Sequence, residues 1–209
     1  MNFNLPEQTH VHTFIPKNTF FSRAVVNTKL KKEFTDAIQK ITWEYKLAPD
    51  TVGIVSTESV EEIQIFYIEL KEQVIPKNVL KLIDKTIAYP ILYRFIYKDH
   101  EAFGITLRTV GDKKYYFTEW DNRPEFRFTG QNLERVYEGL VEVFIGQTLT
   151  PEKDFVTIVE QDKEKGGLER EIQSLQKKLK SEPHFNRQVE INTQLQGKKN
   201  ALNTITNQD

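Results

Sequence analysis

The most informative segment for the fold is Glu62–Leu70, EIQIFYIEL. It is rich in β-branched and aromatic residues, which favour strands. Its apolar side chains fall on both faces of an alternating strand, where Ile63, Ile65 and Tyr67 alternate with Phe66, Ile68 and Leu70. A strand that is apolar on both faces is covered on both sides. The segment therefore predicts the central strand of a sheet with other structure packed against each face.

Upstream of this strand, residues 28–46 follow helical spacing. One stripe of the predicted helix is apolar and consists of Leu30, Phe34, Ile38, Ile41 and Tyr45. Charged and amide side chains lie off this stripe, as expected for an amphipathic helix. Pro49 and Asp50 are expected to end it. Residues 1–27 are predicted to form an arm with short extended pieces.

Downstream, the pattern predicts a helix from Pro76 to about Ala88, because proline suits the first turn of a helix. Three strands follow, at residues 89–98, 101–110 and 113–120. The turns at Asp99-His100 and Gly111-Asp112 are short enough for antiparallel hairpins. A short extended piece with Phe126 and Phe128 precedes a helix over residues 131–145. This order of elements predicts an α+β domain with a mostly antiparallel sheet packed by helices.

The composition changes after Pro151, where Lys, Glu, Gln and Asn become dominant. We therefore predict two domains, a globular α+β domain over residues 1–150 and a C-terminal helical hairpin over residues 151–209. Apolar residues in the second part are spaced as in a coiled coil. They are Leu168, Ile172, Leu175, Leu179, Ile191, Leu195 and Leu202. Ser181-Glu182-Pro183 separates the two predicted helices.

This hairpin is expected to bind a partner. Two helices that share one narrow apolar seam are marginally stable on their own, so the seam residues are predicted to contact a protein partner or a second copy of the chain. The hairpin contains ten basic and ten acidic residues, which argues against a direct phosphate-binding role. Nucleic acid is expected to be reached through the partner.

Composition excludes several classes of function. The 29 basic and 30 acidic residues give a net charge of -1, so any contact with nucleic acid must be local. Disulfides, thiolate metal sites and cysteine nucleophiles are excluded because the chain has no cysteine. The N-terminal residues lack the pattern of a signal peptide, and no apolar run is long enough to span a membrane. We expect a cytoplasmic protein that does not contact membranes.

One alternative is catalytic. Asp50, Glu69 and Lys71 have the order of an Asp…Glu-x-Lys nuclease, in which two carboxylates bind Mg²⁺ and the lysine activates water. Glu69 and Lys71 are two residues apart on a strand and therefore leave it on the same face. The competing interpretation is that both lie at the solvated end of a structural strand. No cofactor is expected apart from Mg²⁺ in this alternative.

Two other patterns in the sequence are weaker. His10 and His12 alternate like metal ligands on a strand, although no third ligand is evident beside them. Aromatic residues of the three later strands, interleaved with Arg94 and Lys114, could stack nucleic-acid bases. The preferred interpretation is that these aromatic residues form the core.

A set of landmarks along the chain resembles one family. They are Pro16-Lys17 before Phe20-Phe21, Trp43 before Lys46-Leu47-Ala48-Pro49, Glu62–Phe66, Leu82-Ile83-Asp84-Lys85, Tyr89-Pro90-Ile91-Leu92, Trp120, Asn132-Leu133 and Phe185-Asn186-Arg187. Together they resemble the bacterial proteins grouped as domain of unknown function 4391. The resemblance supplies no catalytic residues. It implies a context, since such proteins are often encoded beside helicase and methyltransferase genes in restriction-like phage-defence loci.

We therefore expect a non-catalytic accessory protein with a protein partner, plausible partners being a helicase or a methyltransferase that acts on DNA. The Mg²⁺-dependent nuclease remains the alternative.

Overall fold

The computed structural model describes residues 3–108, 113–146 and 154–206. The chain divides into two compact units, Met1–Gly146 and Gln147–Asp209. The first is an α+β unit and the second contains two helices packed together, so the predicted fold class is confirmed. The two units are described separately below.

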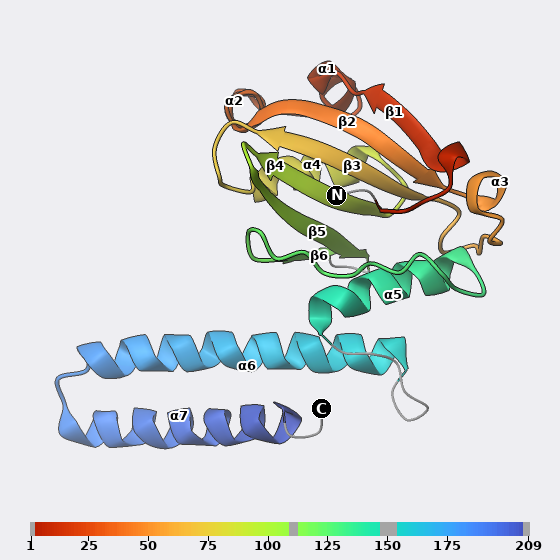
Figure 1. The fold of residues 1–209 in the computed structure, drawn as a ribbon. Coiled ribbons are helices and arrows are strands. Elements are labelled where there is room, and N and C mark those ends of the chain that lie inside the picture. Colours follow the sequence, from red (N-terminus) through yellow and green to blue (C-terminus); the bar gives the residue numbers. More distant parts are fainter. Residues whose placement is uncertain (1–2, 109–112, 147–153, 207–209) are drawn as a thin grey trace. The chain divides into compact units, whose positions relative to one another are not determined.

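The first unit is built on one six-stranded sheet, shown in Figure 1. Its strands follow the order of the chain: β1 (His10–Phe14), β2 (Ile38–Leu47), β3 (Ile63–Leu70), β4 (Ile91–Tyr97), β5 (His100–Arg108) and β6 (Lys113–Phe117). All neighbouring strands are antiparallel except β3 and β4. A parallel pair needs a crossover connection, which here contains helix α4 (Lys77–Thr86). The predicted turn at Gly111-Asp112 lies outside the described residues.

The predicted helix over residues 28–46 is wrong in its second half. Helix α2 covers only Thr28–Ala37, and Ile38 begins β2. The β2 pairing has register shifts between Ile38 and Lys40 and between Trp43 and Tyr45. Each shift inserts an extra residue, and such bulges disturb strict alternation. Ile38 and Ile41 therefore share a face although they are three residues apart, which imitates helical spacing.

Three smaller differences concern the connections. The N-terminal segment contains a 3₁₀ turn (Glu7–Thr9), strand β1 and a short helix α1 (Lys17–Ser22) in place of a mainly extended arm. Residues Pro49–Val52 form the short helix α3, so Pro49 begins a helix where we expected one to end. The segment with Phe126 and Phe128 is not part of a strand.

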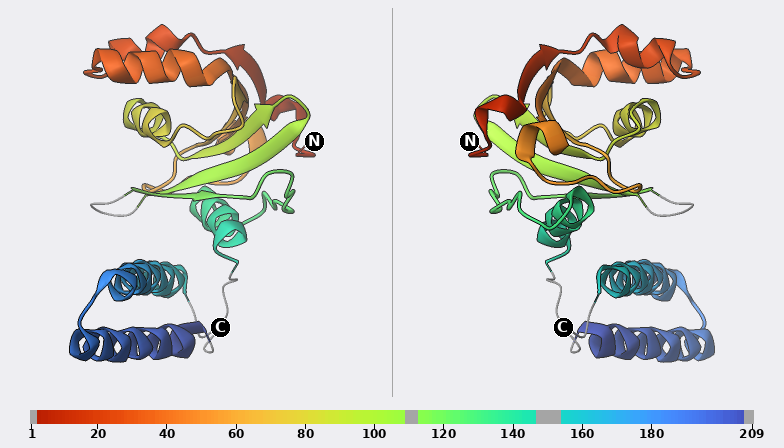
Figure 2. Two further views of the ribbon diagram at one scale, coloured as in Figure 1. Left: turned by 90° about the vertical axis from the view of Figure 1, so that its left-hand side faces the viewer. Right: turned by 90° about the vertical axis from the view of Figure 1, so that its right-hand side faces the viewer.

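Helices α1, α2 and α4 cover one face of the sheet, and Figure 2 shows them on the side opposite the N-terminus. The core between them contains Phe20, Phe34, Ile41, Phe66, Ile68, Ile83, Tyr93 and Phe95. Asp84 is also buried here and accepts hydrogen bonds from the hydroxyls of Tyr93, Thr106 and Tyr115. Helix α4 is thus tied to three strands by one carboxylate.

The other face of the sheet is covered by an aromatic cluster and by helix α5 (Leu133–Ile145). Phe3 is the centre of the cluster, since its ring contacts those of Tyr45, Tyr67, Phe103, Phe126 and Phe128. Both faces of β3 are therefore covered, as its sequence predicted.

The second unit is a pair of helices, α6 (Phe155–Ser181) and α7 (Phe185–Thr206), which pack together. Asp154 begins α6 by accepting a hydrogen bond from the amide of Thr157, a typical N-cap. Within the described part of the chain, neither these helices nor any other combines the length and the apolar character that a membrane span requires.

Candidate functional site

The apolar seam of the second unit has two kinds of residue. Ile172 of α6 and Leu195 of α7 are 8% and 4% exposed, respectively, and are the buried members of the predicted set. The other predicted seam residues are half-buried: Leu168, Leu175, Leu179, Ile191 and Leu202. Only part of the hairpin's apolar surface is therefore buried between α6 and α7.

A groove of about 620 Å³ lies between α6 and α7. Leu168 and Leu175 supply its apolar wall on α6. The remaining lining residues are Glu164, Glu171, Ser174, Lys178, Gln194, Gly197, Lys198 and Ala201. Leu168 and Leu175 are one heptad apart, which places them on the same side of the helix. They are the two leucines of the α6 wall, and Glu171 lies between them.

Small residues keep this groove open on the α7 side. Gly197 and Ala201 are four residues apart and therefore lie on one face of the helix. A Cβ atom added at Gly197 would meet no heavy atom within 4 Å. A larger side chain at either position would occupy space that the groove now leaves free.

One ion pair joins two residues of the groove lining, one from each helix. The ammonium of Lys198 lies 2.6 Å from a carboxylate oxygen of Glu171. In the sequence, Lys198 stands between Leu195 and Leu202, where it interrupts the apolar seam. Its acidic partner on the other helix is the signal that would have identified it as a cross-helix contact.

Two exposed apolar residues of α7 were missed by the seam pattern. Phe185 is 75% exposed and Val189 is 50% exposed, and both lie in the first turns of α7. They are four residues apart and share one face. A search for apolar residues outside the heptad positions would have found them.

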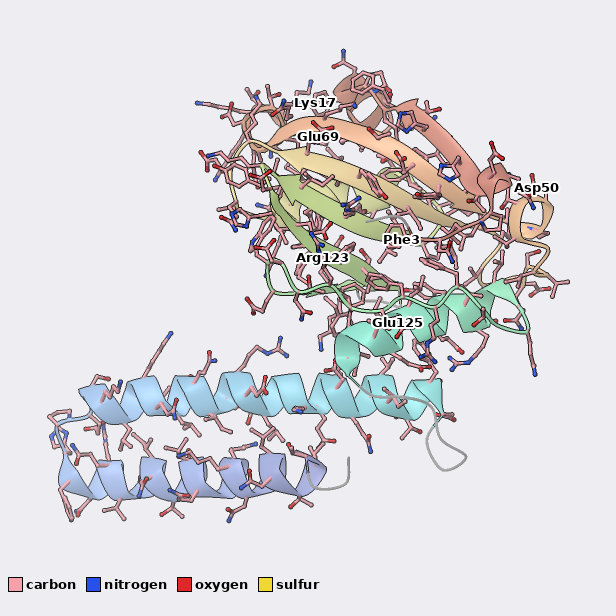
Figure 3. All side chains as sticks on the ribbon, viewed as in Figure 1. Phe3, Lys17, Asp50, Glu69, Arg123 and Glu125 are labelled. Carbon is pink, nitrogen blue, oxygen red and sulfur yellow. The ribbon has the colours of Figure 1, made fainter. Side chains whose placement is uncertain are left out.

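The structure does not bring the proposed nuclease residues together, as Figure 3 shows for Asp50 and Glu69. Asp50 lies in α3, directly after the end of β2, where Leu47 pairs with Ile63. Glu69 is beside Leu70 at the other end of β3. A strand of this length spans roughly 20 Å at about 3.3 Å per residue. Two carboxylates so far apart cannot share a metal ion, whose oxygen ligands lie within about 2.6 Å.

Each of the three residues has a local partner instead. Asp50 pairs with Lys46 at 3.2 Å, and Glu69 pairs with Lys40 on the neighbouring strand at 3.6 Å. The ammonium of Lys71 donates a hydrogen bond to the backbone carbonyl of Thr35 at 2.8 Å. This carbonyl belongs to the last turn of α2, where cations are favourable.

Lys17 shares this helix end with Lys71. Its ammonium donates to the carbonyl of Ile38, directly after α2. Burial lowers the pKa of Lys17, and repulsion by Lys71 lowers it further. Both lysines thus serve the end of a helix, which is a structural role.

The histidines give no metal centre. His12 pairs with Glu44 at 3.1 Å, and the ring of His10 lies 4.6 Å from that of Tyr45. In residues 3–108, 113–146 and 154–206, no group of three or more His, Cys, Asp or Glu side chains is arranged to hold a metal ion.

The aromatic residues of the later strands are largely core residues. Tyr93, Phe95 and Phe103 are completely buried. Arg94 lies over the ring of Tyr67 and forms an ion pair with Glu101. This part of the sheet therefore does not present the exposed rings that base stacking requires.

Comparisons with known proteins support one assignment. The family model of DUF4391, a domain of unknown function, matches residues 3–202. No curated protein and no solved structure matches the chain.

Proposed function

Since the chain belongs to the DUF4391 family, we propose that it is a non-catalytic interaction protein that docks on a larger protein through the groove of its C-terminal hairpin. One observation carries this proposal. Leu168 and Leu175 line an open groove, whereas Ile172 and Leu195 alone are buried among the predicted seam residues. Apolar side chains that line an open groove between paired helices are typical of sites that bind a partner helix.

The groove suits an amphipathic helix of the partner. Its α6 wall extends from Glu164 to Lys178, which corresponds to about 20 Å at 1.5 Å per residue. That length accommodates about four turns of a partner helix. The wall is acidic at Glu164 and basic at Lys178, so the favoured helix carries basic residues at one end and acidic residues at the other.

From the family resemblance we further propose that the partner is a helicase or a methyltransferase that acts on DNA in a bacterial restriction-like phage-defence system. The protein would then act in the cytoplasm. DNA would then be reached at least in part through this partner.

We expect the double substitution Leu168→Asp and Leu175→Asp to abolish recovery of the partner. Two carboxylates in the apolar wall would have to be desolvated on binding, at a cost of several kcal/mol. A photo-crosslinking residue at Ala201, on the opposite wall, reports the contact in the full-length protein. When Leu168 and Leu175 are unchanged, the residue at position 201 should crosslink to an amphipathic segment of one larger protein. The crosslinked protein is purified from the native cell and identified by mass spectrometry.

The matched control is Lys163→Glu with Lys177→Glu, because both lysines are exposed on α6 and neither lines the groove. This variant should crosslink like the unaltered protein. Equal crosslinking by the aspartate variant would contradict the proposal. Crosslinks only between two copies of the chain would instead assign the groove to self-association.

The nuclease alternative has a direct test. We expect the purified protein to leave duplex DNA intact in the presence of Mg²⁺, because Asp50 and Glu69 are at opposite ends of β3. Lys71→Ala should lower the free energy of unfolding by less than about 1 kcal/mol, since it removes one exposed hydrogen bond. Gel analysis of the DNA and urea-induced unfolding measure the two results. Mg²⁺-dependent cleavage that is lost in Lys71→Ala would support the nuclease.

A further inference from the structure

Helices α2 and α4 carry a concentration of lysines. There are six: Lys29, Lys31, Lys32, Lys77, Lys81 and Lys85. The same helices contain three acidic residues, Glu33, Asp36 and Asp84, and Asp84 is buried on the sheet side. The chain as a whole has a net charge of -1, so this positive surface is local.

Three of these lysines line one groove. Lys29 of α2 and Lys81 and Lys85 of α4 lie around a hollow of about 400 Å³ between the two helices. The helices are joined across it by hydrogen bonds from the Asn78 amide to both carboxylate oxygens of Glu33, at 3.2 and 3.3 Å. Glu33 is the acidic residue of the groove lining.

The lysines of this groove are available for a ligand. Among the residues that the structure describes, Lys29, Lys81 and Lys85 form no ion pair within 4.0 Å, and all three are exposed. Lys81 and Lys85 are four residues apart, or about 6 Å along the helix axis. Their flexible stems allow each ammonium to meet a separate phosphate, and B-DNA carries a phosphate about every 3.4 Å along each strand.

We propose that the groove between α2 and α4 binds the phosphate backbone of double-stranded DNA directly. The polar side chains in the groove are already engaged, since Asn27 accepts a hydrogen bond from the amide of Leu30 and Asn78 donates to Glu33. Few donors therefore remain to recognise base edges. Contacts to phosphates alone position a protein on DNA without specifying its sequence.

A membrane surface fits this groove less well. Peripheral membrane helices insert an exposed apolar face below the lipid headgroups. Of the apolar lining residues, Leu82 is only 4% exposed and Leu30 packs against the core, so Val25 is the one that is fully exposed. A single exposed valine is less than the apolar face that membrane insertion requires, whereas the three lysines match phosphate-backbone recognition.

Binding of a fluorescent duplex of about 20 base pairs, measured by anisotropy across a range of salt concentrations, tests the proposal. For three phosphate contacts, the logarithm of the association constant should fall with the logarithm of salt concentration with a slope of about -3. The variant Lys29→Glu, Lys81→Glu and Lys85→Glu should bind at least about tenfold more weakly, with a slope near zero. Each single Lys→Gln variant should reduce the slope by about one.

The matched control is Lys163→Glu, Lys177→Glu and Lys180→Glu, which changes the net charge equally on exposed positions of α6. It should bind DNA within about threefold of the unaltered protein, and circular dichroism melts should show all variants folded. Equal weakening by the control would overturn the proposal, because binding would then follow net charge. Absence of DNA binding at low salt, or tighter binding to phosphatidylserine vesicles than to DNA, would also overturn it. None of these results depends on the hairpin groove, so the two proposals fail separately.

Discussion

Replacing Ile65 with aspartate should prevent the unit Met1–Gly146 from folding. Ile65 is completely buried on β3, where it is opposite Tyr45 of β2 and Leu92 of β4. An unpaired carboxylate at such a position costs several kcal/mol. That is a large share of the about 5–15 kcal/mol by which native domains are stable. We expect the variant to be insoluble or to lack a cooperative thermal transition by circular dichroism.

Ile65→Val is the matched control, because it keeps the β-branched shape and removes one methylene group. It should lower the free energy of unfolding by about 0.5–1.5 kcal/mol and keep a cooperative transition. A soluble Ile65→Asp protein that melts cooperatively would show that β3 is not central to the unit.

The second large effect is expected at the ion pair between Arg94 and Glu101. The Glu101 side chain is 4% exposed and that of Arg94 is 14% exposed. Two guanidinium nitrogens of Arg94 lie 2.8 and 2.6 Å from the same carboxylate oxygen, and Arg123 approaches the other oxygen. Burial opposes the charge on Arg94, but hydrogen bonds to Glu101 and Tyr67 outweigh it and raise the pKa of Arg94.

Arg94→Met should therefore lower the free energy of unfolding by about 3–5 kcal/mol, because it leaves a buried carboxylate without its main partner. Adding Glu101→Leu should recover most of this loss, since a buried ion pair can often be replaced by apolar residues at little cost. Urea-induced unfolding of the single and double variants measures both effects.

Arg127→Met is the control for loss of an arginine. Arg127 pairs with Glu125, and both side chains are almost fully exposed. Exposed ion pairs contribute about 0–1 kcal/mol, so this variant should remain close to the unaltered protein. If Arg94→Met were equally mild, the buried pair would not contribute to stability as proposed.

The predictable parts of the fold were those with a strong local pattern. Strand β3 was identified from its apolar residues on both faces, and α6 and α7 were identified from heptad spacing. The apolar positions of these patterns also predict a core of nine residues, and eight of them are buried: Phe34, Ile41, Ile65, Ile68, Ile83, Leu92, Phe95 and Leu140. The ninth, Phe144, is half-buried.

Strand β2 shows why local pattern was insufficient elsewhere. Its two register shifts change which side chains share a face, and they exist only because β2 pairs with β3. Residues 38–45 alone fit helical spacing equally well. Pairing with β3, whose partner residues lie 16 to 32 positions away along the chain, decided between the two structures.

Side-chain chemistry and local periodicity could therefore be inferred from the amino-acid sequence, including the carboxylate and ammonium groups of Asp50, Glu69 and Lys71 and the apolar seam of the hairpin. The sequence did not show which of these side chains lie close together in the folded protein. The antiparallel register of β2 and β3 separates Asp50 from Glu69, and the packing of α2 beside α4 brings Lys29 to the same groove as Lys81 and Lys85. Distances between residues far apart in the chain depend on strand register and helix packing, which result from burial of the whole core rather than from any local pattern.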